Sequence, residues 1–391
     1  MLSGQPRYVL RRERSGGFLF DRITGTLERI GEGHYTLLDR AHNLGTGASG
    51  VRKYLSESFA DERNAEGFLS SCVQRGILEE DKASSLHIVR PPLPAERLPI
   101  ECHSAPSRLY WRITERGIRP DCDESCDVSL ETAKSILRKI AEAGTFEIWI
   151  FGGEPTLHPF FPGIVSAAKE QGLFVTVETH ATFDETTRNK MLDSLVDRFA
   201  IIVAGAAVAH DTLFGEGVYR MMVEFLSRLA QRGEKFITLV MPIGKSNIDK
   251  LEDAIGMVKQ VRGEDLMVIP AGGEEKITLV QYAERINKAA GLAEGLGVLL
   301  NTPTDLHGPN GWSISGCPAG VSDAYLNQEG MLRACRFCDD EREPMGNITD
   351  LGYISLWLDS SRFDAYRENP PGCLAKIRLF DGNQKRRGIC K

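Results

Sequence analysis

The clearest chemical potential in this chain lies in one short segment, Glu147–Pro159, which reads Glu-Ile-Trp-Ile-Phe-Gly-Gly-Glu-Pro-Thr-Leu-His-Pro. A β-branched and aromatic run ends in two glycines, a carboxylate and a proline, as in a buried parallel strand that delivers a turn to a sheet edge. Gly152 and Gly153 let a ligand approach the main chain, and Glu154 can accept a hydrogen bond from an ammonium group. The segment predicts a ligand-binding turn; an ordinary strand-to-helix turn is the alternative.

Cysteine is the second residue type that could do chemistry. Nine cysteines, an odd number without an export signal, do not indicate a disulfide framework. Cys122 and Cys126 could hold a metal together with a carboxylate of Asp123, Glu124 or Asp127, or they could be two thiols without a metal. Five further cysteines crowd the C-terminal quarter, namely Cys317, Cys335, Cys338, Cys373 and Cys390.

Length and composition limit the class of protein. A chain of 391 residues is expected to form two or three domains, and 42% hydrophobic with 26% charged residues is typical of a soluble globular protein. The net charge of −7, without a basic stripe, argues against nucleic-acid binding. The first residues lack the apolar core of a secretory signal, and the longest apolar run, Phe199–Ala209, is too short to span a bilayer. We expect a cytoplasmic protein that does not bind membranes.

The elements that position these residues fall into three units. Strand-like runs at Tyr8–Arg12, Gly17–Asp21 and Leu27–Ile30 precede helical patterns at Tyr35–Leu44, Ala48–Phe59 and Asn64–Arg75. This order predicts a winged-helix-like domain over residues 1–82, followed by a proline-rich linker at 83–106. Cys72 lies in an apolar helical pattern that is typical of a small core residue.

The middle unit, residues 107–305, alternates strands with helices. The expected strands are Leu109–Ile113, Glu147–Phe151, Phe174–Glu178, Ala200–Ala204, Phe236–Met241 and Leu266–Ile269. Ser129 is a good N-cap for the clearest helix. About six βαβ units predict an α/β fold, a partial (β/α)6 barrel, with its functional residues at the C-terminal strand ends, among them Thr179 and His180.

The first unit resembles the PqqD-like family, whose members hold leader peptides during ribosomal peptide maturation. The resemblance rests on Tyr8-Val9-Leu10-Arg11, Gly17-Phe18-Leu19-Phe20-Asp21, Thr24-Gly25 and the closing run from Phe68-Leu69 through Gly76-Ile77-Leu78-Glu79. It implies that a leader peptide adds as a strand beside the third strand and contacts the third helix. The residues so implied are Leu27, Glu28, Arg29, Ile30, Phe68 and Cys72. A DNA-binding winged helix is the alternative, but the unit lacks a basic recognition helix.

The second unit resembles the radical SAM fold. The resemblance rests on Phe151-Gly152-Gly153-Glu154-Pro155, on Leu157-His158-Pro159, on Gly205-Ala206 with His210-Asp211, on Gly215-Glu216-Gly217 and on Asn247. In that family the Gly-Gly-Glu-Pro turn binds the methionine amine of S-adenosylmethionine. The resemblance therefore implies a cofactor site that includes Gly152, Gly153, Glu154, Pro155, Thr179 and His180.

The sequence departs from this family at the cluster motif. The family carries Cys-x3-Cys-x2-Cys after the first strand, three thiolates that hold a [4Fe-4S] cluster. The expected cysteines fall on Gly117, Asp121 and Glu124, and a shifted frame gives Cys122, Cys126 and then Ser129, which is better explained as the helix cap. The polar residues usually offered by the fourth strand are replaced by Val203 and Ala204, so the cofactor equipment is degenerate while the scaffold is kept.

The third unit, residues 306–391, resembles the SPASM/twitch extension, which in complete members carries auxiliary iron–sulfur clusters. The motifs are Gly316-Cys317-Pro318, the run Gly330 to Cys335 with Cys338, and Gly346-Asn347-Ile348. One four-thiolate site from Cys317, Cys335, Cys338 and Cys373 or Cys390 could hold zinc or iron–sulfur; buried thiols in a residual fold are the alternative.

Three hypotheses follow. In the first, the chain is a radical-SAM-fold member of a ribosomal peptide maturation pathway that binds the precursor and acts with a partner, such as an intact radical SAM protein. In the second, it is an active enzyme in which an atypical cluster at Cys122 and Cys126 supports hydrogen abstraction from a precursor side chain. In the third, the fold has been recruited to bind a metal or a small molecule, because fold does not determine function.

Overall fold

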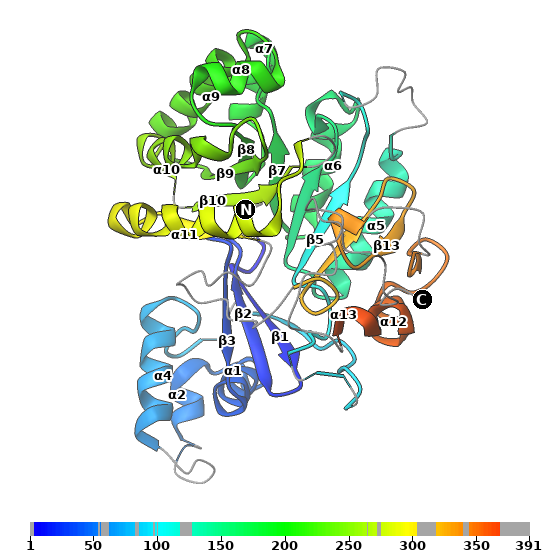
Figure 1. Cartoon of the computed structure of the whole chain (residues 1–391). Helices are drawn as coiled ribbons and strands as arrows, with labels where there is room; N and C mark the ends of the chain where they lie inside the picture. The colour runs from blue at the N-terminus through cyan, green and yellow to red at the C-terminus, as the bar shows by residue number, and fades with distance from the viewer. Residues whose placement is uncertain are drawn as a thin grey trace.

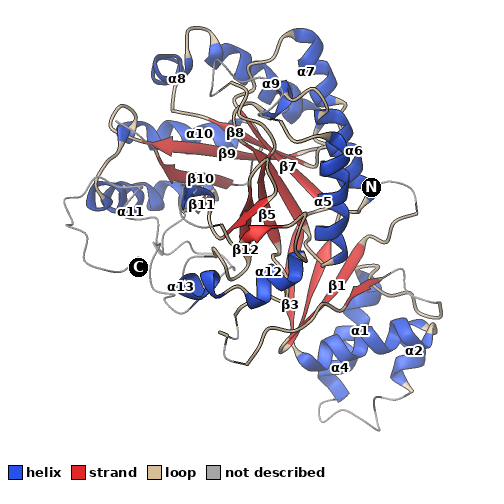
Figure 2. Cartoon of the chain, turned by 90° about the vertical axis from the view of Figure 1, so that its right-hand side faces the viewer, coloured by secondary structure: helices blue, strands red, loops and turns tan. Residues whose placement is uncertain are grey.

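The computed structural model shows an N-terminal unit below a larger barrel-like unit, with short C-terminal elements beside the barrel (Figure 1). It describes residues 4–53, 55, 62–82, 86–96, 98–99, 101–117, 127–263, 265–271, 275–302, 318–338 and 344–367. Within these ranges, no helix combines the length and hydropathy needed to cross a bilayer. Figure 2 shows the strands gathered in two separate sheets, one in each unit.

The N-terminal unit is a four-stranded sheet covered on one face by helices. Its elements are β1 (Tyr8–Glu13), β2 (Gly16–Asp21), β3 (Thr26–Ile30), α1 (Glu32–Leu44), α2 (Gly47–Arg52), α4 (Glu62–Gln74) and β4 (His87–Val89). The strand order is β3-β2-β1-β4, so β3 and β4 are the two edges. Leu10, Leu38 and Leu69 are completely buried between the sheet and the helices.

The segment 83–106, predicted as a linker, contains the strand β4. His87, Ile88 and Val89 pair in parallel with Val9, Leu10 and Arg11 of β1. Sequence patterns missed this strand because it has only three residues and is followed by Pro91 and Pro92. The connection between the two units is therefore partly built into the first sheet.

The second unit is a parallel sheet with helices packed against it. Its main elements are β5 (Arg108–Arg112), α5 (Leu130–Glu142), β6 (Glu147–Phe151), α6 (Phe161–Glu170), β7 (Phe174–Thr179), α7 (Glu185–Leu192), β8 (Arg198–Ile202), α8 (Ala207–Phe214), α9 (Val218–Arg232), β9 (Phe236–Ile243), α10 (Leu251–Gln260), β10 (Asp265–Pro270), α11 (Leu279–Leu296) and β11 (Leu299–Asn301). The predicted α/β partial barrel is confirmed, with β5 to β10 as its six parallel strands and β11 as a seventh.

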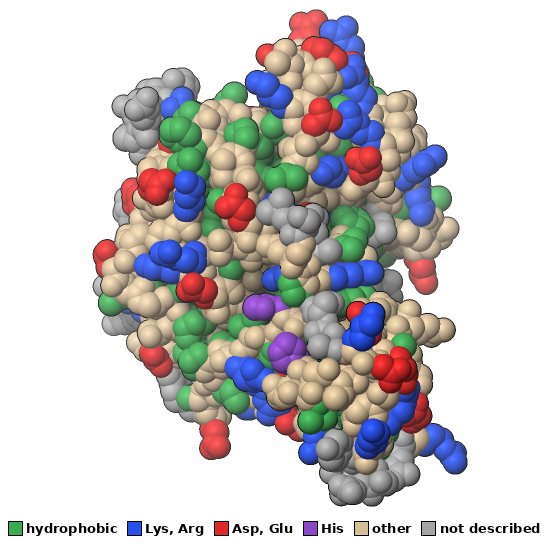
Figure 3. All heavy atoms as spheres, turned by 180° about the vertical axis from the view of Figure 1, so that it is seen from behind, with side chains coloured by type: hydrophobic (Ala, Val, Ile, Leu, Met, Phe, Trp, Pro, Cys, Tyr) green, Lys and Arg blue, Asp and Glu red, His purple; other side chains and the backbone are tan. Residues whose placement is uncertain are grey.

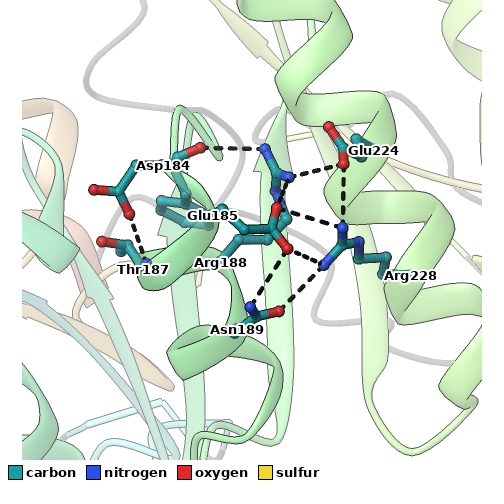
Figure 4. A network of polar contacts seen from close by, with 8 residues as sticks. Asp184, Glu185, Thr187, Arg188, Asn189, Glu224 and Arg228 are labelled. Carbon is teal, nitrogen blue, oxygen red and sulfur yellow. Dashed lines mark hydrogen bonds and ion pairs between the residues drawn. The ribbon is translucent and has the colours of Figure 1, made fainter.

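Local signals explain most of these boundaries. Ser129 caps α5, as predicted, because its hydroxyl accepts a hydrogen bond from the Thr132 amide at 3.1 Å. β8 begins and ends two residues earlier than predicted. Val203 and Ala204 are as buried as strand residues, which is why the apolar pattern included them, but they lie after the end of the strand. Helices α7 and α9 are joined by Arg188, which lies between the carboxylates of Glu185 and Glu224 (Figure 4).

The C-terminal elements extend the same sheet. They are β12 (Asp323–Leu326), β13 (Met331–Arg333), β14 (Gly346–Asn347), α12 (Tyr353–Asp359) and α13 (Asp364–Arg367). β12 pairs in parallel with β5, and β13 and β14 continue as an antiparallel ribbon. Trp357 of α12 is completely buried and donates its indole N–H to the His103 carbonyl at 2.8 Å. The C-terminal elements thus pack against the chain that enters the barrel.

The N-terminal sheet is docked on the lower edge of the barrel. Phe20 stacks on Phe146 with ring centroids 4.9 Å apart, and Gly25 approaches Phe174 so closely that a Cβ there would lie 2.9 Å from the ring. Arg11 is completely buried and donates to Glu13 at 2.7 Å and to the Gly144 carbonyl at 2.8 Å. Apolar and charged contacts therefore hold the two units together.

Candidate functional site

The Gly-Gly-Glu-Pro turn lies where it was expected, directly after β6. Gly152 and Gly153 have φ angles of 95° and 57°, which favour glycine. A Cβ on Gly153 would lie 2.0 Å from the Arg116 carbonyl oxygen, and the Glu154 amide donates to the same oxygen at 2.7 Å. The loop after β5 therefore approaches the turn, and this contact alone requires glycine at position 153.

The carboxylate of Glu154 is held by its own chain. The Thr179 hydroxyl lies 2.8 Å from both carboxylate oxygens, the Thr156 hydroxyl donates at 2.8 Å and the His180 amide donates at 3.1 Å. Glu154 is only 7% exposed, and Pro155 follows it at the start of a short 3-10 helix. The structure thus brings the predicted residues at the ends of β6 and β7 together.

His180 and His210 both contact one aromatic ring, that of Phe214. The rings of both histidines make edge contacts with Phe214, with centroid distances of 5.1 Å and 4.8 Å. His210 is completely buried, its Nδ1 accepts from the Ala204 amide at 3.2 Å, and burial lowers its pKa to about 4. Its Nε2 has no hydrogen-bond partner within the described part of the chain. His210 is therefore neutral at physiological pH.

The end of β5 carries a polar network in place of the family's first thiolate. Arg116 donates to Asp127 through Nε at 2.8 Å, and the Thr114 hydroxyl donates to the other carboxylate oxygen at 2.6 Å. Asp127, considered above as a metal ligand, is thus engaged by Arg116 and Thr114. Gly117 follows at the first position where the family has cysteine, and it has no side chain that could bind a metal.

The superfamily implies S-adenosylmethionine and a [4Fe-4S] cluster, and the two groups fit this chain differently. The turn and its buried carboxylate have the residue types of the family's Gly-Gly-Glu-Pro element, and their role in binding the cofactor stays a prediction. The cluster lacks its three-thiolate donor set, because the expected positions hold Gly117, Asp121 and Glu124. Cys122 and Cys126 lie outside the described residues, so the metal site predicted there stays a prediction.

The predicted C-terminal metal site also stays a prediction. Cys317, Cys373 and Cys390 lie outside the described residues, as does the side chain of Cys338. The Cys335 sulfur lies 3.4 Å from the Phe337 amide, which donates to it. Among the described residues, no group of three or more His, Cys, Asp or Glu side chains could hold a metal ion.

Charged residues inside the barrel were missed by the sequence patterns. Arg108 donates to Glu147 at 2.8 Å, and Thr176 donates to the other Glu147 oxygen at 2.6 Å. Although burial alone acts in the opposite direction, the positive charges of Arg108 and Arg198 lower the pKa of Glu147. The sequence did contain a signal for these pairs: a charged residue stands at the start of strands that were predicted to be buried, and a buried charge needs a partner.

A second missed pair joins the C-terminal unit to the barrel. Arg336 pairs with Glu178 of β7 at 2.7 Å, and its guanidinium lies 4.9 Å from the Tyr110 ring centroid and 5.1 Å from that of Phe151. Burial lowers the pKa of Arg336, but the charge of Glu178 outweighs it and the net shift is upward. An arginine between Cys335 and Cys338 gave no sequence signal for this contact.

The predicted peptide site in the N-terminal unit surrounds β3. Glu28 of β3 pairs with Arg75, just after α4, at 2.7 Å, and the pair borders a cavity of about 270 Å³. Phe68 stacks on His34 with ring centroids 3.9 Å apart. The inclusion of Cys72 needs correction: it is completely buried in the core, and burial raises the pKa of its thiol to about 12. A side chain in that position does not reach a peptide at the surface.

The remaining residues of the predicted peptide site are placed on β3 itself. Arg29 is exposed, Leu27 is half-buried, and Ile30 is 3% exposed and belongs to the core. Because β3 is the edge of its sheet, its outer main-chain groups are not used by another strand of the described chain.

The fold and the turn after β6 define a radical SAM type of partial barrel, and comparison with known proteins agrees. Residues 120–258 match the model of the radical SAM superfamily. The chain is 23% identical over 295 residues to the mycofactocin maturase MftC of Mycobacterium tuberculosis (strain ATCC 25618 / H37Rv). The aligned region covers 68% of this chain and 73% of that protein. MftC of Mycolicibacterium smegmatis is also 23% identical, over 312 residues, covering 71% of this chain and 76% of that protein.

Solved structures show the same fold. SuiB of Streptococcus suis bound to S-adenosylmethionine superposes with a TM-score of 0.65 at 14% identity, covering 93% of this chain and 89% of that chain. Tagged anSMEcpe with bound AdoMet gives a TM-score of 0.53 at 11% identity, covering 68% and 83% of the two chains. Together, these matches indicate a radical SAM domain and a similarity to mycofactocin maturases.

Proposed function

We propose that this chain binds the precursor peptide of a ribosomally made natural product through its N-terminal unit and acts in its maturation together with a partner protein. The observation that carries the proposal is the edge strand β3, which lies beside a cavity of about 270 Å³ bordered by the Glu28–Arg75 pair. An extended peptide can add to such an edge through main-chain hydrogen bonds, while neighbouring pockets select its side chains. SuiB, which shares the fold, has been solved bound to its precursor peptide SuiA.

The barrel contributes a cofactor-like site with a degenerate cluster motif. Gly152, Gly153, Glu154 and Pro155, with Thr179 and His180, would hold the methionine end of S-adenosylmethionine. That cofactor, together with a reducing cluster, supplies radical chemistry when bound. Because this chain lacks the three-thiolate set, it carries out no radical step itself, and the bond-forming chemistry takes place in the partner.

Peptide titration tests the binding claim. Synthetic peptides from the short reading frames that flank the gene are titrated into the full chain, and we expect one of them to bind. Phe68→Ala removes the ring that stacks on His34 and should weaken binding at least tenfold, whereas Phe160→Ala, an exposed aromatic on the barrel, should not. Equal losses in both variants, or no binding by any peptide, would contradict the proposal.

The alternative, an active enzyme with an atypical cluster, is favoured by the Cys122 and Cys126 spacing. Iron and sulfide analysis after anaerobic reconstitution separates the two. The first hypothesis predicts the same iron content in the wild-type chain and in the Cys122→Ser/Cys126→Ser double variant. A deficit of a full cluster in the variant, with 5′-deoxyadenosine released by the reduced wild-type protein, would establish the alternative.

A further inference from the structure

A cleft of about 700 Å³ lies between the N-terminal sheet and the lower edge of the barrel. It is separate from the turn after β6 and from the cavity beside β3. Its lining includes Phe20, Arg22, His87, Val89, Phe146 and Gly172. Its volume falls within the range of about 300–1,000 Å³ that is typical of ligand-binding pockets.

Arg22 is the unusual group in this cleft. It is 9% exposed, and it donates one hydrogen bond from Nη1 to the Pro6 carbonyl at 2.9 Å. Its Nε has no partner, and no carboxylate of the described residues lies within ion-pair distance of it. Burial accordingly lowers the pKa of Arg22 with no opposing charge. A buried cation without a counter-charge is costly, so an anion at this position would be favoured.

Two neighbouring arginines have the counter-charge that Arg22 lacks. Arg7 pairs with Asp21 at 2.7 Å, and Arg11 pairs with Glu13 at 2.7 Å. Gly172 leaves room for the guanidinium of Arg22, because a Cβ there would lie 2.6 Å from its central carbon. The barrel is thus shaped around a charged group that it does not neutralise.

The cleft is also bordered by an edge strand. β4 pairs with β1 on one side, and no strand of the described chain pairs with its other side. Val89 of β4 packs with the apolar cluster that includes Val9 and Phe20, and His87 lies two residues away on the same side of the strand. An edge strand beside an apolar wall is a template for one more extended segment.

We infer that this cleft binds an acidic residue of a peptide that lies extended beside β4, with its carboxylate on the guanidinium of Arg22. Arginine and carboxylate form a strong, charge-assisted hydrogen-bonded pair. The exposed carboxylates of Glu142 and Glu170 stand at the rim and disfavour acidic residues away from Arg22. This inference adds a second peptide contact to the proposed function. It rests on the proposed function only in taking the bound peptide to be the precursor. The site would be a second contact, on the opposite edge of the sheet from β3.

Matched peptides test the carboxylate. The full chain is titrated with acetylated and amidated Val-Thr-Glu-Val-Thr, with the same peptide carrying Gln for Glu, and with inorganic phosphate. We expect the Glu peptide to bind at least tenfold more tightly than the Gln peptide, and this preference to be lost in Arg22→Met but kept in Arg232→Met, an exposed control. Equal binding of the two peptides, a preference that survives in Arg22→Met, or displacement of the peptide by phosphate at equal concentration would overturn the inference.

Hydrogen exchange on the wild-type chain gives a second readout that needs no variant. We expect the Glu peptide to protect the amides of residues 86–90. If the Glu peptide protects residues 86–90 but no precursor peptide binds the chain, this inference is supported and the proposed function is contradicted. Protection by a precursor at residues 26–30 alone, with none at 86–90 for either peptide, would overturn this inference and leave the proposed function intact.

Discussion

Removal of the Arg11 side chain should separate the two units energetically. Arg11 lies in β1, is completely buried, and donates to Glu13 at 2.7 Å, to the Gly144 carbonyl at 2.8 Å and to the Ser107 hydroxyl at 2.9 Å. The Ser104 amide donates to the other Glu13 oxygen at 2.8 Å, so the pair joins the N-terminal sheet to the segment that enters the barrel.

The size of the effect follows from what Arg11→Ala leaves behind. Glu13 is 6% exposed and would become a buried carboxylate without its cation. Loss of one partner of a buried ion pair typically lowers the free energy of unfolding by about 3–5 kcal/mol, which is more than an exposed ion pair contributes. We therefore expect the free energy of unfolding to fall by about 4 kcal/mol, with an unfolding transition of the N-terminal unit that precedes that of the barrel.

Urea unfolding followed by circular dichroism and by tryptophan fluorescence measures this separation. The fluorescence reports on the barrel and C-terminal elements, because Trp111, Trp149 and Trp357 are buried there. The double variant Arg11→Met/Glu13→Gln should recover most of the loss, since no charge is left unpaired. A loss below about 1 kcal/mol in Arg11→Ala, typical of an exposed pair, or coincident transitions with both probes, would refute the reasoning.

Three further predictions concern the barrel. Arg188→Ala removes the buried arginine of the network in Figure 4 and leaves Arg228 paired with Glu185 and Glu224. The loss of its hydrogen bonds to charged groups should lower the free energy of unfolding by about 1.5–3 kcal/mol, whereas Arg232→Ala, at an exposed pair with Asp193, should cost under about 1 kcal/mol in the same urea titration. Glu154→Gln should lower the melting temperature, because one carboxylate oxygen becomes a donor facing the Thr179 hydroxyl and the His180 amide; an unchanged value in calorimetry would contradict this. His210 is protonated more readily in the unfolded chain, so stability that is complete above about pH 6.5 should fall by up to about 3 kcal/mol as the pH decreases towards 4; a His210→Gln variant with the same pH profile would contradict this.

The sequence predicted the barrel because its core strands are fully apolar runs bounded by turn residues. Both ends of the strand Glu147–Phe151 were predicted correctly, and Ser129 was identified as a helix cap, because both signals are local. The turn at Gly152 and Gly153 was predicted because glycine readily adopts the positive φ angles that such a turn requires. These features depend on neighbours in the chain, so they can be recognised without the structure.

Contacts between distant segments could not be predicted in the same way. Arg336 reaches Glu178 across 158 residues, and Arg11 reaches Gly144 across 133 residues. Each looks in sequence like a solvated arginine, which is the usual state of that residue. β4 was missed because its strand character comes from pairing with β1 and not from its own three residues.

Charged side chains of both signs share the face of the molecule that Figure 3 shows. Figure 3 shows acidic and basic side chains interspersed over both lobes, without a continuous basic stripe on this face. With a net charge of −7, electrostatic attraction to a phosphate backbone is weak. A peptide ligand that uses strand addition and a single buried cation is consistent with this surface.

Hydrogen exchange of the full chain, with and without the peptide found by titration, shows whether a precursor peptide binds along β3. We expect strong protection of the amides in residues 26–30 and in α4, with the exchange of the barrel strands unchanged. Exchange in residues 26–30 that is unaffected by a bound peptide would contradict this expectation.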